Sequence, residues 1–150
     1  MKTSKIIGLI LGIVQLSMAL ALIVGMHTLL GVFTSALPKE AGEIEFQLTD
    51  PVIIPITLTP VNNGFLEASM DVAVSILVEG VNVAADSESV VIHPGGMVPV
   101  ELELSIPLVD FQEYFREGVN LEWKTDIKVA TLYDLISFSN HMVVEGGLNS

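Results

Sequence analysis

Residues 6–33 read IIGLILGIVQLSMALALIVGMHTLLGVF, a run of 28 residues without Asp, Glu, Lys or Arg. A bilayer core about 30 Å thick needs roughly 20 apolar residues of helix, at about 1.5 Å per residue. Because lipid offers no hydrogen bonds to the backbone, a single apolar segment can span it only as a helix. We therefore expect one transmembrane helix over residues 6–33, long enough to cross the bilayer with some tilt.

Basic residues lie close to this run mainly on its amino-terminal side. Lys2 and Lys5 precede it, whereas Lys39, the first basic residue after it, is followed at once by Glu40. Because lysine and arginine favour the cytoplasmic side of a membrane helix, residues 1–5 are expected to form a cytoplasmic tail. The sequence therefore predicts a single-pass protein of the cell membrane, with the chain after about residue 37 outside the cytoplasm.

A cleavable signal peptide is the alternative interpretation of the same run. Thr34, Ser35 and Ala36 are small residues of the kind found at cleavage sites, and cleavage there would leave a mature chain that begins near Leu37. The apolar core of a signal peptide is usually about 7–15 residues long. The run is nearly twice that length, so it favours a retained anchor in the lipid bilayer.

The membrane helix carries small residues that suit contact with a second helix. Such residues let two helix backbones approach closely, and a polar side chain among them can add an interhelical hydrogen bond. Other membrane protein subunits are the partners that such a face would bind. Small residues are also frequent in membrane helices that bind nothing, so both interpretations stay open. The candidate association face comprises Gly8, Gly12, Gln15, Ser17, Ala21 and Gly25.

The remainder of the chain is acidic and free of cysteine. All 18 Asp and Glu residues follow Lys39, and the net charge of the whole chain is -12. This charge disfavours nucleic acid and anionic lipid headgroups as partners. After a linker over residues 34–43, residues 44–150 are long enough for one extracytoplasmic domain, which is stabilised by its core without disulfides.

Alternation of apolar and polar residues with a period of two dominates this domain, and is clearest over residues 66–78. Such alternation predicts strands with one buried face. Pro55 restricts its strand to a sheet edge, because proline cannot donate a ladder hydrogen bond. Between Pro107 and Gly118 the spacing becomes helical and predicts a short helix. The expected strands cover residues 44–48, 52–58, 66–78, 81–83, 90–92, 98–106, 119–129 and 135–144.

The expected turns complete the fold prediction. Asn62-Asn63-Gly64 predicts a turn, because Asn and Gly tolerate positive φ, and a polar loop is expected over residues 85–89. Seven or so strands in about 110 residues favour an all-β fold. We therefore expect an antiparallel β-sandwich of the immunoglobulin or fibronectin III kind with one short helix, preceded by a single transmembrane α-helix.

The order of these elements resembles a known family. The resemblance rests on Asn62-Asn63-Gly64, on Gly80-Val81, on His93-Pro94-Gly95-Gly96, and on Phe111 to Gly118 followed by Val119-Asn120-Leu121. Over roughly residues 44–145 the chain resembles the water-stress and hypersensitive-response (WHy) domain of type 2 late embryogenesis abundant proteins. The family's usual Asn-Pro-Asn appears here only as Pro60-Val61-Asn62-Asn63. The resemblance implies a fibronectin-like, often membrane-tethered domain linked to stress response, without catalytic residues.

The sequence predicts no catalytic, cofactor-binding or metal-binding residues. The three histidines, His27, His93 and His141, have no cysteine with which to build a thiolate zinc site. Asp86 and Glu88 lack the spacing of an EF-hand loop, so a solvated acidic loop is the simpler interpretation. Nucleophile-elbow, phosphate-loop and dinucleotide motifs do not occur in the sequence. The protein is therefore not expected to be an enzyme, and no cofactor is expected.

Three functions of different classes fit these features. The first is a non-catalytic, membrane-anchored extracytoplasmic binding or stress-protective module. The second is an accessory single-pass subunit of a larger membrane protein complex. The third is a filament subunit resembling type IV pilins, which the short leader disfavours because it lacks the Gly before a processing site and a Glu near the start of the apolar run.

Overall fold

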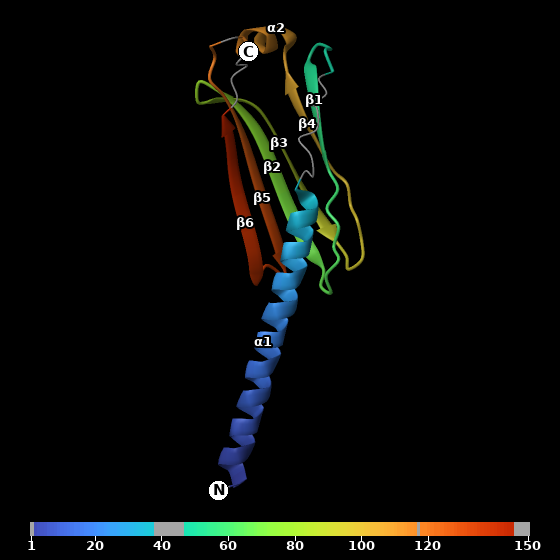
Figure 1. The fold of residues 1–150 in the computed structure, drawn as a ribbon, viewed down its shortest axis with the longest axis vertical. Coiled ribbons are helices and arrows are strands. Elements are labelled where there is room, and N and C mark those ends of the chain that lie inside the picture. The colour runs from blue at the N-terminus through green and yellow to red at the C-terminus, as the bar shows by residue number, and fades with distance from the viewer. Residues whose placement is uncertain (1, 38–46, 117, 146–150) are drawn as a thin grey trace.

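A computed structural model of the protein describes residues 2–37, 47–116 and 118–145. The described chain is β-rich and antiparallel, with a long apolar helix at its amino-terminal end and one short helix (Figure 1). These features confirm the coarse fold prediction, whereas the assignment to the immunoglobulin or fibronectin III kind stays a prediction. The elements are α1 (Lys2–Ala36), β1 (Val52–Leu58), β2 (Ala68–Val78), β3 (Val81–Ile92), β4 (Val100–Ile106), α2 (Leu108–Tyr114), β5 (Leu121–Thr131) and β6 (Ile136–Glu145).

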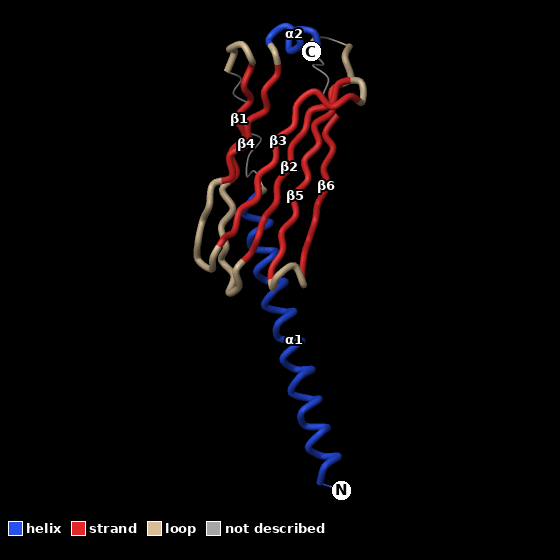
Figure 2. The backbone as a smooth tube through the Cα atoms, turned by 180° about the vertical axis from the view of Figure 1, so that it is seen from behind, coloured by secondary structure: helices blue, strands red, loops and turns tan. Residues whose placement is uncertain are grey.

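The strands form two antiparallel sheets. One has four strands in the order β3-β2-β5-β6, and the other has two, β1 and β4. Figure 2 shows the four-stranded sheet in front of α1, with β1 and β4 to one side. The carboxyl-terminal end of α1 packs on the inner face of β2, β5 and β6. This end of the helix and the two-stranded sheet therefore cover the four-stranded sheet together.

α1 is one continuous helix of 35 residues with two different environments. Residues Ile7–Ala36 are long and apolar enough to cross a membrane. Side chains over residues 7–23 are exposed, whereas Leu29, Val32 and Ala36 are 1%, 0% and 3% exposed and belong to the core of the β-domain. The helix continues three residues beyond the end predicted at Phe33, into the expected linker. Residues 38–43 of that linker lie outside the described residues.

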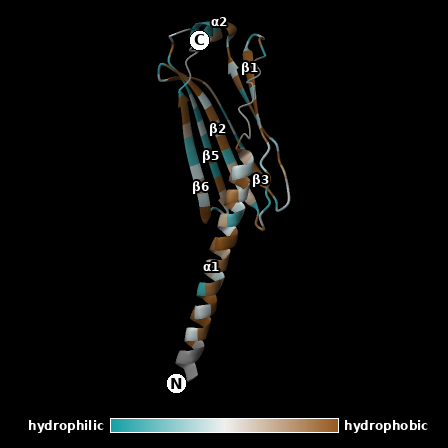
Figure 3. Ribbon diagram, viewed as in Figure 1, coloured by the Kyte–Doolittle hydropathy of each residue, from teal (hydrophilic) through white to brown (hydrophobic). Residues whose placement is uncertain are grey.

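The alternation in the sequence matches the buried faces of the strands. Even-numbered residues of β2 from Ala68 to Ile76 are buried, and their odd-numbered neighbours point to the other face. β4 alternates in the same way from Val100 to Ile106. Figure 3 shows the contrast between these mixed strands and the apolar length of α1. Burial of one face of each strand accounts for the single core that both sheets share with α1.

The prediction of a polar loop over residues 85–89 is wrong. Residues Val81–Ile92 form one strand, β3, where the sequence predicted two short strands. The carboxylates of Asp86 and Glu88 point toward β4, where they accept hydrogen bonds from the backbone N–H groups of Glu103 (2.8 Å) and Glu101 (2.7 Å). These acidic residues satisfy donors on the edge of the neighbouring sheet, so they lie within a strand although their composition is typical of a loop.

Other local predictions agree with the structure. Among the named strands of the described chain, β1 pairs with β4 alone, so Pro55 lies in an edge strand, opposite Glu103. The short helix is α2, and Gly118 after it has φ +88. Most of the strand predicted over residues 44–48 lies outside the described residues, and Gln47 forms an isolated bridge with Ile53.

Asn62 has a different role from the one predicted. The residues with positive φ do not include Asn62, Asn63 or Gly64. Asn62 is 0% exposed: its side-chain N–H group donates to the carbonyls of Leu66 and Ile92, both at 2.8 Å, and its Oδ1 accepts from Gly64 N at 2.9 Å. The side chain therefore joins the loop after β1 to the end of β3.

Candidate functional site

The junction between α1 and the β-domain is held by close backbone approach. A Cβ added to Gly64 would overlap the side chain of Thr28 and lie 2.7 Å from its Cα. Thr28 is 0% exposed, and its hydroxyl donates to Val24 O (3.0 Å) and accepts from Phe65 N (3.3 Å). Glycine is therefore required at position 64 because a helix crosses it, and not because of its φ angle.

A second polar contact fixes the end of the helix. The Ser35 hydroxyl accepts a hydrogen bond from Val61 N (2.8 Å) and lies 3.0 Å from Val61 O and 2.8 Å from Val32 O. Nearby, the rings of Phe33 and Phe138 meet edge to face at 4.8 Å between centroids. Polar contacts thus join residues 25–36 to the loop after β1, and an aromatic contact joins them to β6.

The structure divides the predicted association face into parts. At about 100° per residue, Gly8, Gly12 and Gln15 share one side of α1, and Ser17 and Ala21 lie on roughly the opposite side. An added Cβ at Gly8 or Gly12 would meet nothing within 4 Å, and Gln15, Ser17 and Ala21 are exposed. The Ser17 hydroxyl donates within its own helix to Ile13 O at 2.9 Å.

Gly25, the last member of that predicted face, is covered by the chain itself. It is buried, and a Cβ added there would lie 2.5 Å from Ile136 Cδ1 and 3.6 Å from Thr131 Cγ2. Gly25 therefore serves the contact between α1 and the hairpin of β5 and β6. The part of the small-residue series that remains open is at Gly8, Gly12, Gln15, Ser17 and Ala21.

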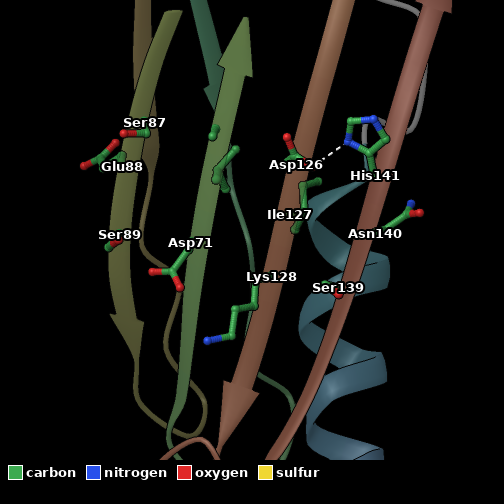
Figure 4. A pocket seen from close by; sticks show the side chains of 12 residues that line it. Asp71, Ser87, Glu88, Ser89, Asp126, Ile127, Lys128, Ser139, Asn140 and His141 are labelled. Atoms are coloured by element: carbon green, nitrogen blue, oxygen red, sulfur yellow. Dashed lines mark hydrogen bonds and ion pairs between the residues drawn. The ribbon is translucent and has the colours of Figure 1, made fainter.

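The outer face of the four-stranded sheet carries a shallow hollow of about 410 Å³ (Figure 4). Two rows of side chains cross the strands here. In one row Asp126 lies beside His141, and in the next Asp71 lies beside Lys128. The Asp126 Oδ1 to His141 Nδ1 distance is 2.6 Å, and both side chains are more than half exposed. The hollow is lined by serines, charged residues and apolar groups, and it is open to solvent.

This arrangement lacks the geometry of a nucleophilic site. Ser87 belongs to the same row as Asp126 and His141 but lies two strands from Asp126, about 10 Å at the usual strand spacing. Within the described ranges, no serine hydroxyl is hydrogen-bonded to the His141 ring. An Asp and a His without a nucleophile in contact can bind a polar ligand, but they do not form a catalytic triad.

The other residues considered from sequence are dispersed. His27 lies on α1 with its ring 6.0 Å from that of Phe65, and His93 is an exposed turn residue whose Nδ1 is 2.8 Å from Glu67 Oε2. Asp86 and Glu88 bind backbone N–H groups of β4. In the part of the chain that the structure describes, no group of three His, Asp or Glu side chains is placed to hold a metal ion.

Sequence reasoning missed the residues of the junction. Thr28 and Ser35 are polar residues seven positions apart, so they share one face of α1 with Leu29, Val32 and Ala36. That pattern could have indicated a helix end buried against protein. No comparable signal in the sequence identifies Gly64 as the residue that contacts Thr28, because Thr28 and Gly64 are 36 positions apart in the chain.

Comparison with known proteins shows the fold alone. The sequence matches no family model and no curated protein. A crystal structure of a protein from Archaeoglobus fulgidus is 12% identical, covers 74% of this chain and 98% of its own, and has a TM-score of 0.50. A putative β-galactosidase from Bacteroides fragilis is 15% identical, with 70% of this chain and 15% of that enzyme covered and a TM-score of 0.46. The resemblance to the WHy domain stays a prediction.

Proposed function

We propose that the protein is a non-catalytic, single-pass membrane protein that holds an acidic β-domain outside the cytoplasm as a binding module. The observation that carries this proposal is the division of α1 into a bare apolar part, residues 7–23, and a part buried in the β-domain. A long exposed apolar helix is costly in water and stable in lipid. Lys2 and Lys5 favour the cytoplasm for its amino-terminal end. A protective role in stress is implied only by the resemblance to the WHy domain.

The buried end of α1 supports retention of the helix. Cleavage after Ala36 would remove Leu29 and Val32, which are 1% and 0% exposed in the core that α1 shares with the strands. Loss of buried side chains of this size leaves a cavity and exposes the apolar faces that they cover. The domain therefore needs residues 25–36 to complete its core.

The hollow around Asp126 and His141 is included in this proposal as a candidate surface for a polar ligand. Its side chains carry both signs of charge and hydroxyl groups, and they project from neighbouring strands of one rigid sheet. Open surfaces of this kind suit binding more than chemistry, since they exclude little water. When ligands are screened, substitutions in this hollow would show whether a ligand binds there.

Extraction and mass measurement test the anchor. Membranes from cells that express the full chain are washed at alkaline pH, and the protein is then released with detergent and its intact mass determined. We expect it to resist the wash and to include residues 1–36. Protease added to intact cells should digest the β-domain. A mature chain that begins near Leu37, or a β-domain protected from external protease, would overturn the proposal.

A second candidate function is an accessory subunit of a membrane complex. It is favoured by the open face of Gly8, Gly12 and Gln15, where no side chain of the described chain lies within 4 Å of an added Cβ at either glycine. A glutamine side chain exposed to lipid gains a hydrogen bond when a second helix supplies a partner. This face would then bind another helix while the β-domain stays on the outer surface.

Substitutions on the two sides of α1 separate these candidates. Gly8→Ile together with Gly12→Ile should abolish co-purification of other membrane subunits in mild detergent, because the added side chains keep the helices apart. Ser17→Leu together with Ala21→Leu is the matched control on the opposite side and should leave it unchanged. If nothing co-purifies with the unaltered protein, the accessory-subunit function is wrong.

A further inference from the structure

In the loops of the described chain, four large apolar side chains are exposed at the end of the β-domain where α1 leaves it. They lie in the loops after β1, β3 and β5, which Figures 1 and 2 show around the helix at this end. At the opposite end, the exposed apolar side chains of the start of β3 and of α2 are valines, Val81 and Val109. We call the four residues the rim: Phe65 (74% exposed), Met97 (63%), Tyr133 (101%) and Leu135 (83%).

The loop between β5 and β6 holds its part of the rim in an unfavourable backbone conformation. Leu132, Tyr133 and Asp134 have φ values of 53, 56 and 64, and Leu135 N donates to Leu132 O at 3.2 Å to close the turn. Non-glycine residues adopt such φ values infrequently because the Cβ atom is crowded. The tight turn directs Tyr133 away from the core, although an aromatic ring is ordinarily more stable when it is buried.

The rim lies at the height where the bilayer surface is expected. From Lys5 to Gly25 the helix rises about 30 Å, which is about the thickness of the hydrocarbon core. A Cβ added at Gly25 would meet Thr131 and Ile136, the residues on either side of the Tyr133 loop. Phe65 N donates a hydrogen bond to the hydroxyl of Thr28, which lies about one helical turn after Gly25. Both loops therefore meet α1 where it would emerge from the hydrocarbon.

Charged groups near the rim have partners within the protein. Asp134 Oδ1 lies 3.5 Å from Lys128 Nζ, and Glu67 Oε2 lies 2.8 Å from His93 Nδ1. Pairing lowers the cost of bringing a carboxylate close to lipid. Aromatic side chains with a polar tip, such as tyrosine, are favoured at the boundary between headgroups and hydrocarbon.

We infer that the rim is a lipid-contacting surface, and that it seats the β-domain directly on the outer leaflet of the bilayer that α1 crosses. This inference rests on the proposed function, since it requires α1 to span the membrane. The partner is the interfacial region of a neutral, phosphatidylcholine-like bilayer, because the acidic domain is repelled by anionic headgroups. The strands of the domain then point away from the bilayer, and the hollow around Asp126 and His141 is held at a fixed distance from the membrane.

Spin labels measure the depth of the rim directly. The chain contains no cysteine, so four single variants of the full chain can be labelled and reconstituted in phosphatidylcholine vesicles. Val14→Cys places a label in the membrane helix, Phe65→Cys and Tyr133→Cys place labels in the rim, and Val81→Cys places one at the opposite end of the domain. Each label is tested for collision with oxygen, which concentrates in lipid, and with a water-soluble nickel chelate.

The inference expects a ratio of oxygen to nickel collisions that is several-fold higher at positions 65 and 133 than at 81, and highest at 14. A high ratio at 14 with equal ratios at 65, 133 and 81 would overturn the rim while leaving the anchor intact. A low ratio at 14 would overturn the proposed function itself. Labels at 65 and 133 that are shielded from both reagents would show that protein covers the rim, which also contradicts the inference.

Discussion

The two ends of α1 have similar composition and opposite surroundings. Leu9 and Ile23 are 67% and 70% exposed, whereas Leu29 and Val32 are 1% and 0% exposed. Both pairs are apolar, and both avoid water if the exposed part lies in lipid. The difference teaches that hydropathy reports transfer out of water without indicating which apolar medium receives the side chain. The apolar run by itself therefore left the buried contact between its last residues and the β-domain unrecognised.

The largest expected effect separates two neighbouring leucines of the buried end. Leu29→Ala should lower the free energy of unfolding of the β-domain by about 3 kcal/mol, because it leaves a cavity in the core. Leu30→Ala is the matched control: Leu30 is 52% exposed, and the change should be within about 0.5 kcal/mol. Denaturant unfolding of the full chain in detergent, followed by the fluorescence of Trp123, measures both. Equal effects would contradict the burial of this end of α1.

The next effect concerns the buried amide that joins the loop after β1 to β3. Asn62→Ala removes three hydrogen bonds and should cost about 2.5 kcal/mol, at roughly 0.8 kcal/mol net for each. Asn63 is exposed, so Asn63→Ala should change the stability by less than about 0.5 kcal/mol. The same unfolding measurement tests the pair. A small loss for Asn62→Ala would mean that water replaces the amide, and that the loop does not depend on it.

Close approach of the helix is tested at Gly64. Gly64→Ala should destabilise the domain by about 2 kcal/mol, because its Cβ forces Thr28 and the helix backbone away from the loop. Gly31→Ala is the control, since an added Cβ there meets nothing within 4 Å and should stabilise the helix by up to about 1 kcal/mol. Thermal unfolding in detergent measures the two shifts, which should have opposite signs. A shift of the same sign in both would argue against the tight crossing.

The smallest effect distinguishes two adjacent hydroxyl groups at the end of α1. Ser35→Ala removes the acceptor of Val61 N and should cost about 1 kcal/mol. Among the described residues, Thr34 donates only within its own helix, to Leu30 O and Gly31 O, so Thr34→Ala should be close to neutral. Hydrogen exchange at the Val61 amide offers a local measurement. Faster exchange in Ser35→Ala alone would confirm the contact, whereas equal exchange in both variants would count against it.

Much of the fold could be predicted from local pattern. The buried residues of β2 and β4 alternate as expected, α2 follows the change to helical spacing, and Pro55 lies in an edge strand. β3 could not be predicted over its full length, because its central acidic residues are stabilised by N–H groups of β4 that are distant in sequence. Propensity describes a residue with its neighbours in the chain, and these bonds depend on neighbours in space.

The candidate sites show the same limit. The small residues of α1 are visible in the sequence, but their division between an open face and the covered Gly25 depends on where the β5–β6 hairpin lies. The hollow around Asp126 and His141 requires strands 5 and 6 to pair in register. The rim consists of apolar residues from three loops, each unexceptional alone, that acquire a common position only when the strands and α1 are assembled.

By itself the amino-acid sequence determined that this chain begins with a long apolar helix and continues as an acidic antiparallel β-domain, because helix length and strand alternation are local consequences of side-chain polarity. Tertiary structure alone decided where the exposed part of α1 ends and its buried part begins. It also decided that Gly64 lies against the helix, and which polar side chains join the helix and the loops. Those features depend on contacts between residues far apart in the chain, and local patterns carry little information about such contacts.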